Sequence, residues 1–184
     1  MAQEVGANLW HMGSLAGIMW AFKSPECEHG LCPLTFAMKA PGFMMVGPSG
    51  PRFVNEDQTT RHGLMNYAGT YRSQPAVVPA YGIFDSAYMA AKGRIYPQFS
   101  ADNSYEIENG YFIVADTLEE LAQKLYDDMP DFVRQPNAPE KTGTFADRFL
   151  ATVDRWNADF AAGGDTLYGR SADSMYSIAE PPFY

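Results

Sequence analysis

The sequence predicts an α+β fold, in which a small mixed or antiparallel sheet packs against helices. Short apolar runs separated by turn residues predict strands in the first half of the chain. Two segments of the second half carry apolar residues at helical spacing. These strands and helices do not follow the regular β-α-β alternation of a parallel sheet. With 184 residues, the chain has the length of one domain with a sizeable core.

The predicted strands are short. Residues 42–46 are apolar, and a Pro/Gly-rich turn at residues 47–51 separates them from residues 52–54, so we predict a hairpin. Residues 81–85 predict a central strand, and residues 110–114 predict another.

Three helices are predicted. Asp85 and Ser86 can cap a short helix that extends to Lys92. Thr117 and Glu120 are spaced as a capping box at the start of a second helix. Its apolar face consists of Leu118, Leu121, Ala122 and Leu125. The apolar face of a third helix, which ends at Gly163-Gly164, consists of Phe145, Phe149, Val153, Trp156 and Phe160.

Composition excludes several classes of protein. The chain has 13 Lys and Arg residues against 22 Asp and Glu residues, a net charge of −9. Nucleic-acid binding depends on clustered basic residues, so we predict no nucleic-acid partner. With 46% apolar and only 19% charged residues, the chain is not a disordered acidic tail. The most apolar stretch, residues 9–22, is too short to span a bilayer.

Cys27, His29 and Cys32 are spaced as a possible metal-binding loop. They offer three ligands where a structural zinc site uses four, so we predict no metal and favour a plain loop or a local disulfide. A cysteine nucleophile would need an oriented histidine, and no residue evidently orients His29. The sequence contains neither Gly-x-Gly nor Gly-x-Ser-x-Gly, which argues against a dinucleotide fingerprint and a hydrolase elbow.

Residues 50–62 carry the strongest functional signal. A predicted strand continues directly into two acidic residues, two threonines, an arginine and a histidine. On spacing alone, this segment is interpreted as a solvated strand end with a surface ion pair.

Resemblance to a known family changes that interpretation. The segment RFVNEDQTTRHG resembles the capping (clamp) domain of the fumarate reductase and succinate dehydrogenase flavoprotein family, and most closely its branch of soluble fumarate reductases, urocanate reductase and 3-ketosteroid dehydrogenases. Similar segments follow in the family's order over nearly the whole chain: MAQEVGANLWHM, YGIFDSAY, ADTLEELAQKL, FLATVDRWNADFAAGGDTLYGR and IAEPPFY.

The resemblance implies a domain organisation. Residues 1–184 would form a single substrate-capping domain, of the flavoprotein capping-domain type, cut out of a larger FAD-dependent oxidoreductase. The start of the chain reads as a helix end, and we expect the final aromatics, Phe183 and Tyr184, to be uncovered, as in such a piece. The missing domain of the same parent chain would bind FAD, so we expect the isolated fragment to be inactive. A bacterial cytoplasm or periplasm would fit the resemblance.

The resemblance also implies residue roles. In these fumarate reductases the flavin passes a hydride to one alkene carbon, and an arginine of the cap delivers a proton to the other. Arg61 matches that arginine, and Glu56, Asp57 and Thr60 are supporting candidates. His62 and His11 are candidates for binding the substrate.

Two features leave the substrate open. The chain has one residue more than the fumarate reductase pattern between NE and TTR, which could place either Arg61 or His62 at the reacting carbon. Ketosteroid dehydrogenases use tyrosine chemistry in this region, and Tyr67 and Tyr71 follow closely. We expect an unsaturated acid such as fumarate or urocanate as substrate. The alternatives are a 3-oxosteroid, or a free-standing ligand-binding domain without redox activity.

Overall fold

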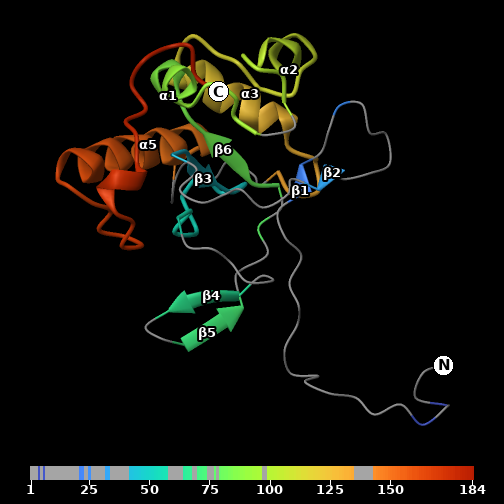
Figure 1. Ribbon diagram of the computed structural model, residues 1–184, viewed down its shortest axis with the longest axis vertical. Helices are drawn as coiled ribbons and strands as arrows, with labels where there is room; N and C mark the ends of the chain where they lie inside the picture. Colours follow the sequence, from blue (N-terminus) through green and yellow to red (C-terminus); the bar gives the residue numbers. More distant parts are fainter. Residues whose placement is uncertain are drawn as a thin grey trace.

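A computed structural model describes residues 4, 6, 21–22, 25, 32–33, 42–57, 64–67, 70–73, 77, 79–96, 99–134 and 143–184. Its elements confirm the predicted α+β class (Figure 1). The strands are β1 (Ala21–Phe22), β2 (Cys32–Pro33), β3 (Met44–Val46), β4 (Leu64–Tyr67), β5 (Thr70–Ser73) and β6 (Tyr81–Ile83). The helices are α1 (Ser86–Lys92), α2 (Ser104–Glu108), α3 (Leu118–Asp128), α5 (Phe145–Ala161) and the 3-10 helix η2 (Ala172–Ser174).

The described strands form three two-stranded antiparallel sheets, β1–β2, β3–β6 and β4–β5. In the β3–β6 pair, Met44 lies opposite Ile83 and Val46 lies opposite Tyr81. The predicted hairpin of residues 42–46 and 52–54 forms only in part. The turn between them forms, but only Val46 and Arg52 make a bridge. Beyond Arg52 the chain leaves the ladder, and the Met45 N–H bonds to the Glu56 carboxylate, which belongs to a buried ionic cluster described below.

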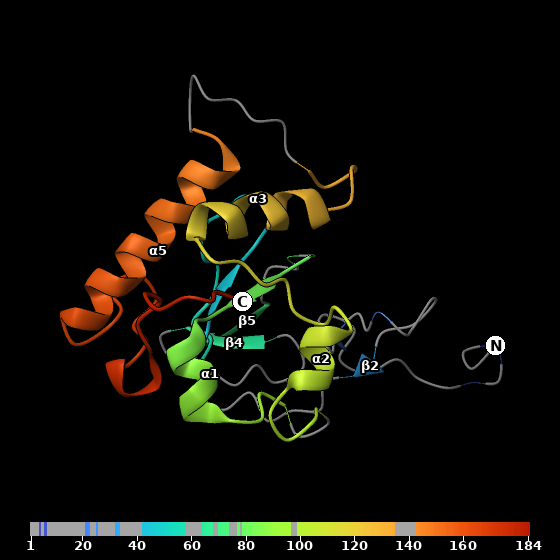
Figure 2. The same ribbon diagram turned by 90° about the horizontal axis from the view of Figure 1, so that it is seen from above.

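Both faces of the β3–β6 sheet are covered. Figure 2 shows α3 and α5 on one side of this sheet and α1 and α2 on the other. Met44, Val46 and Ile83 pack with α3 and α5 in the larger core. Phe43 and Met45 belong instead to an aromatic-rich second cluster. Successive residues of a strand point to opposite faces, so a strand covered on both sides is apolar throughout.

The second cluster brings α1 against the start of β3. Its buried members are Phe43, Met45, Val54, Phe84, Tyr88, Ile95 and Phe99. Tyr88 lies directly over Gly42, where an added Cβ would come within 2.0 Å of the tyrosine ring. Gly42 also has a φ of +76°, a conformation that favours glycine. This close approach therefore requires glycine at position 42.

The two long helices confirm their predicted apolar faces. Leu121, Ala122 and Leu125 of α3 are buried, and α3 packs against α5. In α5 the buried apolar residues are Phe145, Phe149, Val153 and Trp156, while Phe160 is partly buried.

The predicted capping box of α3 forms only in part. The Thr117 hydroxyl accepts from the Glu120 N–H at 3.1 Å, as predicted. The Glu120 carboxylate, however, accepts from the N–H of Asp116 rather than that of Thr117. Glu120 also pairs with Lys124 at 2.7 Å, and this pair holds its side chain along the helix.

The predicted helix from Ser86 to Lys92 is confirmed as α1, and Asp85 is its N-cap. The strand predicted at residues 110–114 is wrong. Gly110 has a φ of +74°, and the Tyr111 N–H bonds to the Glu106 carbonyl at the end of α2, so the chain turns there. Pairing begins only at Ala115, which exchanges two backbone hydrogen bonds with Phe183.

The last two residues are packed, contrary to our expectation. The Phe183 side chain is only 6% exposed. Tyr184 exchanges backbone hydrogen bonds with Phe84, and the two rings stack with centroids 5.3 Å apart. The buried Asp85 carboxylate accepts from the N–H groups of Ala179 and Glu180, which ties the C-terminal segment to α1.

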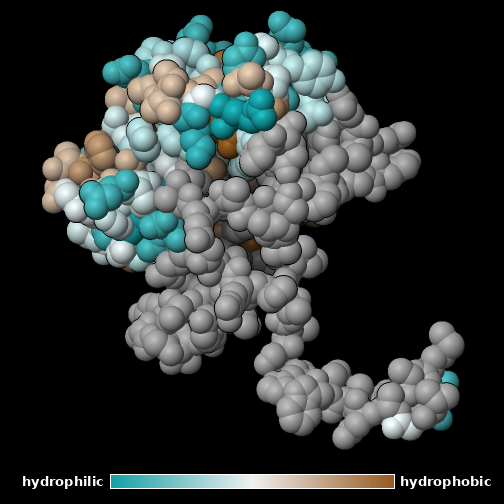
Figure 3. Space-filling model, viewed as in Figure 1, coloured by the Kyte–Doolittle hydropathy of each residue, from teal (hydrophilic) through white to brown (hydrophobic). Residues whose placement is uncertain are grey.

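Figure 3 shows one face of the molecule, where hydrophilic side chains predominate over the described helices. Within the part of the chain that the structure describes, no helix is long and apolar enough to cross a membrane. The same part contains no cluster of His, Cys, Asp and Glu residues suited to a metal ion. Cys27 and His29 lie outside it.

Candidate functional site

The structure describes the start of the candidate catalytic loop but not its tip. Glu56 and Asp57 lie among the described residues, whereas His11, Thr60, Arg61 and His62 lie outside them. The described part of the candidate site is therefore its base, residues 52–57.

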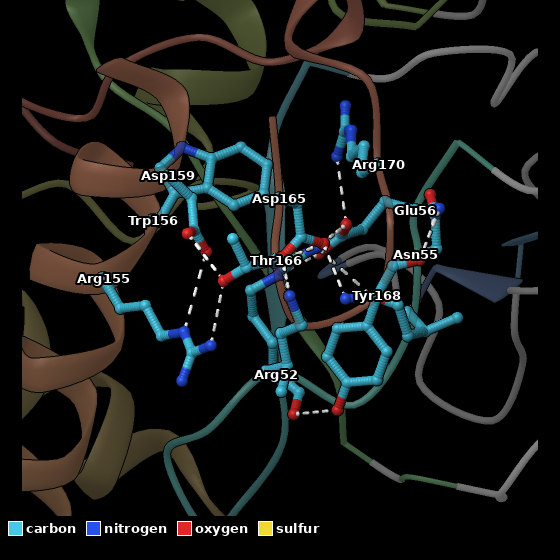
Figure 4. A network of polar contacts seen from close by, with 12 residues as sticks. Arg52, Asn55, Glu56, Arg155, Trp156, Asp159, Asp165, Thr166, Tyr168 and Arg170 are labelled. Atoms are coloured by element: carbon cyan, nitrogen blue, oxygen red, sulfur yellow. Dashed lines mark hydrogen bonds and ion pairs between the residues drawn. The ribbon is translucent and has the colours of Figure 1, made fainter. Parts of the chain in front are cut away.

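A buried ionic cluster lies at this base (Figure 4). We call it the base cluster and define it as Arg52, Glu56, Asp165 and Arg170. The Nε and Nη2 groups of Arg52 donate to the two carboxylate oxygens of Glu56 at 2.9 and 2.6 Å. Such a two-point contact is the geometry in which arginine binds carboxylates most specifically. Arg52 and Glu56 are only 6% and 5% exposed, so the surface ion pair considered from spacing alone is wrong for these residues.

The other two members come from the far end of the chain. Arg170 donates to Glu56 Oε2 at 3.1 Å, and Arg52 Nη1 lies 3.0 Å from Asp165 Oδ2. Asp165 also accepts from the backbone N–H groups of Leu167 and Tyr168. The cluster thus joins residues 52–56 to the turn that follows α5.

Backbone contacts fix the cluster to strand β3. Glu56 Oε1 accepts from the Met45 N–H at 2.9 Å. Arg170 Nη1 donates to the Phe43 carbonyl at 2.8 Å, and its other nitrogens donate to the side chain and the carbonyl of Ser174. Because Glu56 accepts four hydrogen bonds and Arg170 donates four, neither side chain can turn without leaving buried groups unpaired.

Aromatic rings enclose the two arginines. The guanidinium carbon of Arg52 lies 4.6 Å from the centroid of the Trp156 ring, and that of Arg170 lies 5.1 Å from it. The centroid of the Tyr168 ring lies 5.3 Å from the guanidinium carbon of Arg52. The Tyr168 hydroxyl donates to the Arg52 carbonyl at 2.9 Å. These contacts favour cations in a site that excludes water.

The charges of the base cluster balance, with two guanidinium groups against two carboxylates. Burial alone would lower the pKa of Arg52, but hydrogen bonds and the charges of Glu56 and Asp165 outweigh it, and the net pKa is raised. Burial lowers the pKa of Arg170, and the attraction of Glu56 offsets this only in part. Both groups stay charged near neutral pH, since the ordinary pKa of arginine lies above about 12. The cluster is therefore a fixed ionic unit.

The final described residues before the loop form a tight turn. The Asp57 N–H donates to Asn55 Oδ1 at 3.0 Å, and Asn55 Nδ2 donates to the Tyr168 carbonyl at 3.1 Å. Asp57 is half-buried, and within the described residues its carboxylate makes no hydrogen bond or ion pair. Of the two acidic supporting candidates, Glu56 is thus held on all sides, whereas the Asp57 carboxylate accepts no hydrogen bond from the described residues.

The two candidate tyrosines follow the loop. Tyr67 ends β4 and Tyr71 lies in β5, on the hairpin that Figure 1 shows below the helices. The register pairs Tyr67 with Thr70 and Asn66 with Tyr71, so the two tyrosines are not cross-strand partners.

Sequence reasoning missed Asp165 and Arg170. Trp156 was predicted only as a core residue, and Gly163-Gly164 only as a helix end. The available signal was one acidic and one basic residue in the short turn after that end. The same pattern is typical of an exposed turn, so only the three-dimensional contact with Glu56 distinguishes it.

Sequence comparison relates the chain to oxidoreductases, and more particularly to 3-oxosteroid dehydrogenases. No family model matches it. It is 31% identical over 145 residues to a 3-oxosteroid 1-dehydrogenase of Mycolicibacterium smegmatis, a match that covers 74% of this chain and 22% of the relative. It is 28% identical over 171 residues to the 3-oxosteroid 1-dehydrogenase of Mycobacterium tuberculosis, with 79% and 26% covered. The chain spans about a quarter of the length of these relatives.

Solved structures share the fold. A 3-ketosteroid delta1-dehydrogenase from Sterolibacterium denitrificans matches 99% of this chain and 32% of its own with a TM-score of 0.59 and 20% identity. The open conformation of a flavocytochrome c3 fumarate reductase matches 85% of this chain and 22% of its own with a TM-score of 0.50 and 21% identity. The α+β fold, a small antiparallel sheet with packed helices, is thus one found within larger oxidoreductases.

Proposed function

We propose that this chain is the substrate-capping domain of an FAD-dependent oxidoreductase that forms or reduces a carbon–carbon double bond. The observation that carries the proposal is the base cluster, which holds residues 52–57 rigidly at the point where the chain continues to Arg61. A catalytic group needs such a fixed support, because its position must be reproducible to a fraction of an ångström. The similarity to 3-oxosteroid 1-dehydrogenases supports the same class of reaction.

Arg61 is the proposed proton donor. A free guanidinium group has a pKa above about 12 and gives up a proton only to a strong base, such as a carbanion that forms during the reaction. A nearby carboxylate must then return the proton. Asp57 suits this role better than Glu56, because both carboxylate oxygens of Glu56 are already bound by arginine.

Another domain of the proposed parent protein would bind FAD. The sequence contains no Gly-x-Gly fingerprint for a dinucleotide, so we expect the isolated chain to bind no FAD and to be inactive. Bound flavin would supply or accept the hydride. The residues of this chain would bind and orient the substrate and exclude water from it.

Two substrate classes compete. A guanidinium group binds carboxylates as a fork, so Arg61 favours an unsaturated acid. The sequence relatives are 3-oxosteroid dehydrogenases, which favours a 3-oxosteroid, with Tyr67 or Tyr71 as the acid–base group. In both cases hydrogen is transferred at adjacent carbon atoms.

The test uses the full-length protein that contains this chain, purified with its flavin. The flavin is reduced without oxygen and mixed with fumarate, urocanate or a 1,4-diene-3-oxosteroid. We expect one class to reoxidise it rapidly. A parent protein that carries no flavin would overturn the proposal and favour a free-standing ligand-binding domain.

A further inference from the structure

We infer that Arg170 is a positioning residue, which sets the direction in which the chain leaves residues 52–57 towards Arg61. The inference rests on the proposed function, because only then does Arg61 meet a reacting substrate. It assigns a role to the turn after α5, which lies more than a hundred residues from the loop in sequence.

Arg170 joins three separate segments through one planar group. It contacts Glu56 before the loop, the Phe43 carbonyl beside β3, and Ser174 in the 3-10 helix. Its side chain is fully buried, as is that of Glu56. A lysine at this position would carry the same charge but could not donate in these three fixed directions.

The same turn makes a second contact with the base of the loop. The Tyr168 carbonyl accepts from Asn55, and the Asn55 side chain in turn accepts from the Asp57 N–H. Asp165 N–H bonds to the Arg170 carbonyl at 2.9 Å, which closes the turn. Movement of Arg170 is therefore transmitted to Asn55 and Asp57 as well as to Glu56.

The short stretch of chain between Asp57 and Arg61 links the position of the base to catalysis. Arg61 lies four positions after Asp57, a span of at most about 14 Å. A rotation at the base would displace the guanidinium group of Arg61, and a displacement of about 1 Å can cost about 100-fold in rate.

A charge-balanced pair of variants separates positioning from stability. Arg170→Met leaves the cluster with one unbalanced negative charge, which destabilises the fold. Adding Asp165→Asn removes that charge and leaves the Arg52–Glu56 pair intact. Asparagine keeps one oxygen, which can still accept from the Leu167 N–H, while the bond from the Tyr168 N–H to the second oxygen is lost. The matched control is Arg155→Met, because Arg155 is an exposed arginine of α5 that contacts Asp159 and Thr166 but no member of the base cluster.

The experiment measures the thermal midpoint, kcat, KM and the amide exchange of residues 52–57 in the flavin-loaded full-length protein. We expect the Arg170→Met/Asp165→Asn variant to regain most of the thermal midpoint lost in Arg170→Met. Its kcat should stay at least about 10-fold below wild type, with a smaller change in KM. Its residues 52–57 should exchange faster while α3 and α5 remain protected. The control should match wild type.

Recovery of kcat together with the thermal midpoint would overturn the inference, as would wild-type kcat in Arg170→Met. A wild-type protein that turns over neither substrate class would count against the proposed function instead. Amide exchange then decides the inference alone, and unchanged exchange at residues 52–57 would overturn it.

Discussion

At the scale of single residues, Glu56 joins the start of the loop to Arg170 and to β3. It binds two arginines and the backbone of β3 while almost fully buried. Glu56→Gln would replace the carboxylate that the two buried guanidinium groups share by a neutral amide. We expect the free energy of unfolding to fall by about 3–5 kcal/mol, measured by denaturant titration.

The control for that substitution is Glu120→Gln. Glu120 pairs with Lys124 on the exposed surface of α3, where an ion pair contributes less than about 1 kcal/mol. Equal losses in the two variants would contradict the structural role of Glu56.

Tyr88 provides a pH-dependent prediction. Burial raises its pKa to about 12, the neighbouring Tyr176 adds to this, and Arg170 opposes it. Since the pKa in the unfolded chain is about 10, the native state holds this proton more tightly. Its contribution to stability is complete below pH 10 and is lost as the pH rises towards 12.

We therefore expect Tyr88→Phe to lose less stability than wild type between pH 10 and 12, as measured by denaturant unfolding at each pH. Tyr105→Phe, at an exposed tyrosine of α2, is the control and should follow the wild-type curve. A Tyr88→Phe curve parallel to wild type would contradict the raised pKa.

At the scale of elements, the capping box in the first turn of α5 stabilises this helix. The Thr144 hydroxyl accepts from the Asp147 N–H at 3.1 Å, and the Asp147 carboxylate accepts from the Thr144 N–H at 2.7 Å. Thr144→Ala removes this capping box, and we expect a loss of about 1 kcal/mol in the free energy of unfolding. Thr144→Ser keeps the hydroxyl group and should cost much less. A loss in Thr144→Ser as large as in Thr144→Ala would indicate that the methyl group, not the cap, matters.

The elements that could be predicted from sequence are those set by local contacts. The apolar faces of α3 and α5 follow from residues three and four apart, and the α1 cap follows from Asp85. The partner of β3 could not be found this way, because β6 begins 35 residues after β3 ends and the intervening turn suggested a nearer strand.

The same limit explains what was missed at the site. The motif around Glu56 marked residues 52–57 as important, but local reasoning interpreted its charges as solvent-exposed. Their burial depends on Trp156, Asp165 and Arg170, which are distant in sequence and reach the loop only through the packing of α5.

At the scale of the whole molecule, the C-terminal segment holds the two cores together. Phe183 lies in the larger core and bonds to Ala115, while Tyr184 stacks on Phe84 of the aromatic-rich cluster. Asn157 of α5 exchanges two hydrogen bonds with Ile178 in the same segment. The base cluster lies beside this packed unit, so the candidate loop starts from a rigid body.

The central claim is that Arg61 acts on the substrate, and one measurement tests it directly. The full-length flavoprotein is reduced without oxygen, and flavin reoxidation by an unsaturated acid is followed for wild type, Arg61→Ala and the exposed control Arg94→Ala. We expect the rate to fall at least about 100-fold in Arg61→Ala, with flavin still bound, and to stay unchanged in Arg94→Ala. An unchanged rate in Arg61→Ala would contradict the account and move the acid–base chemistry to His62 or a tyrosine.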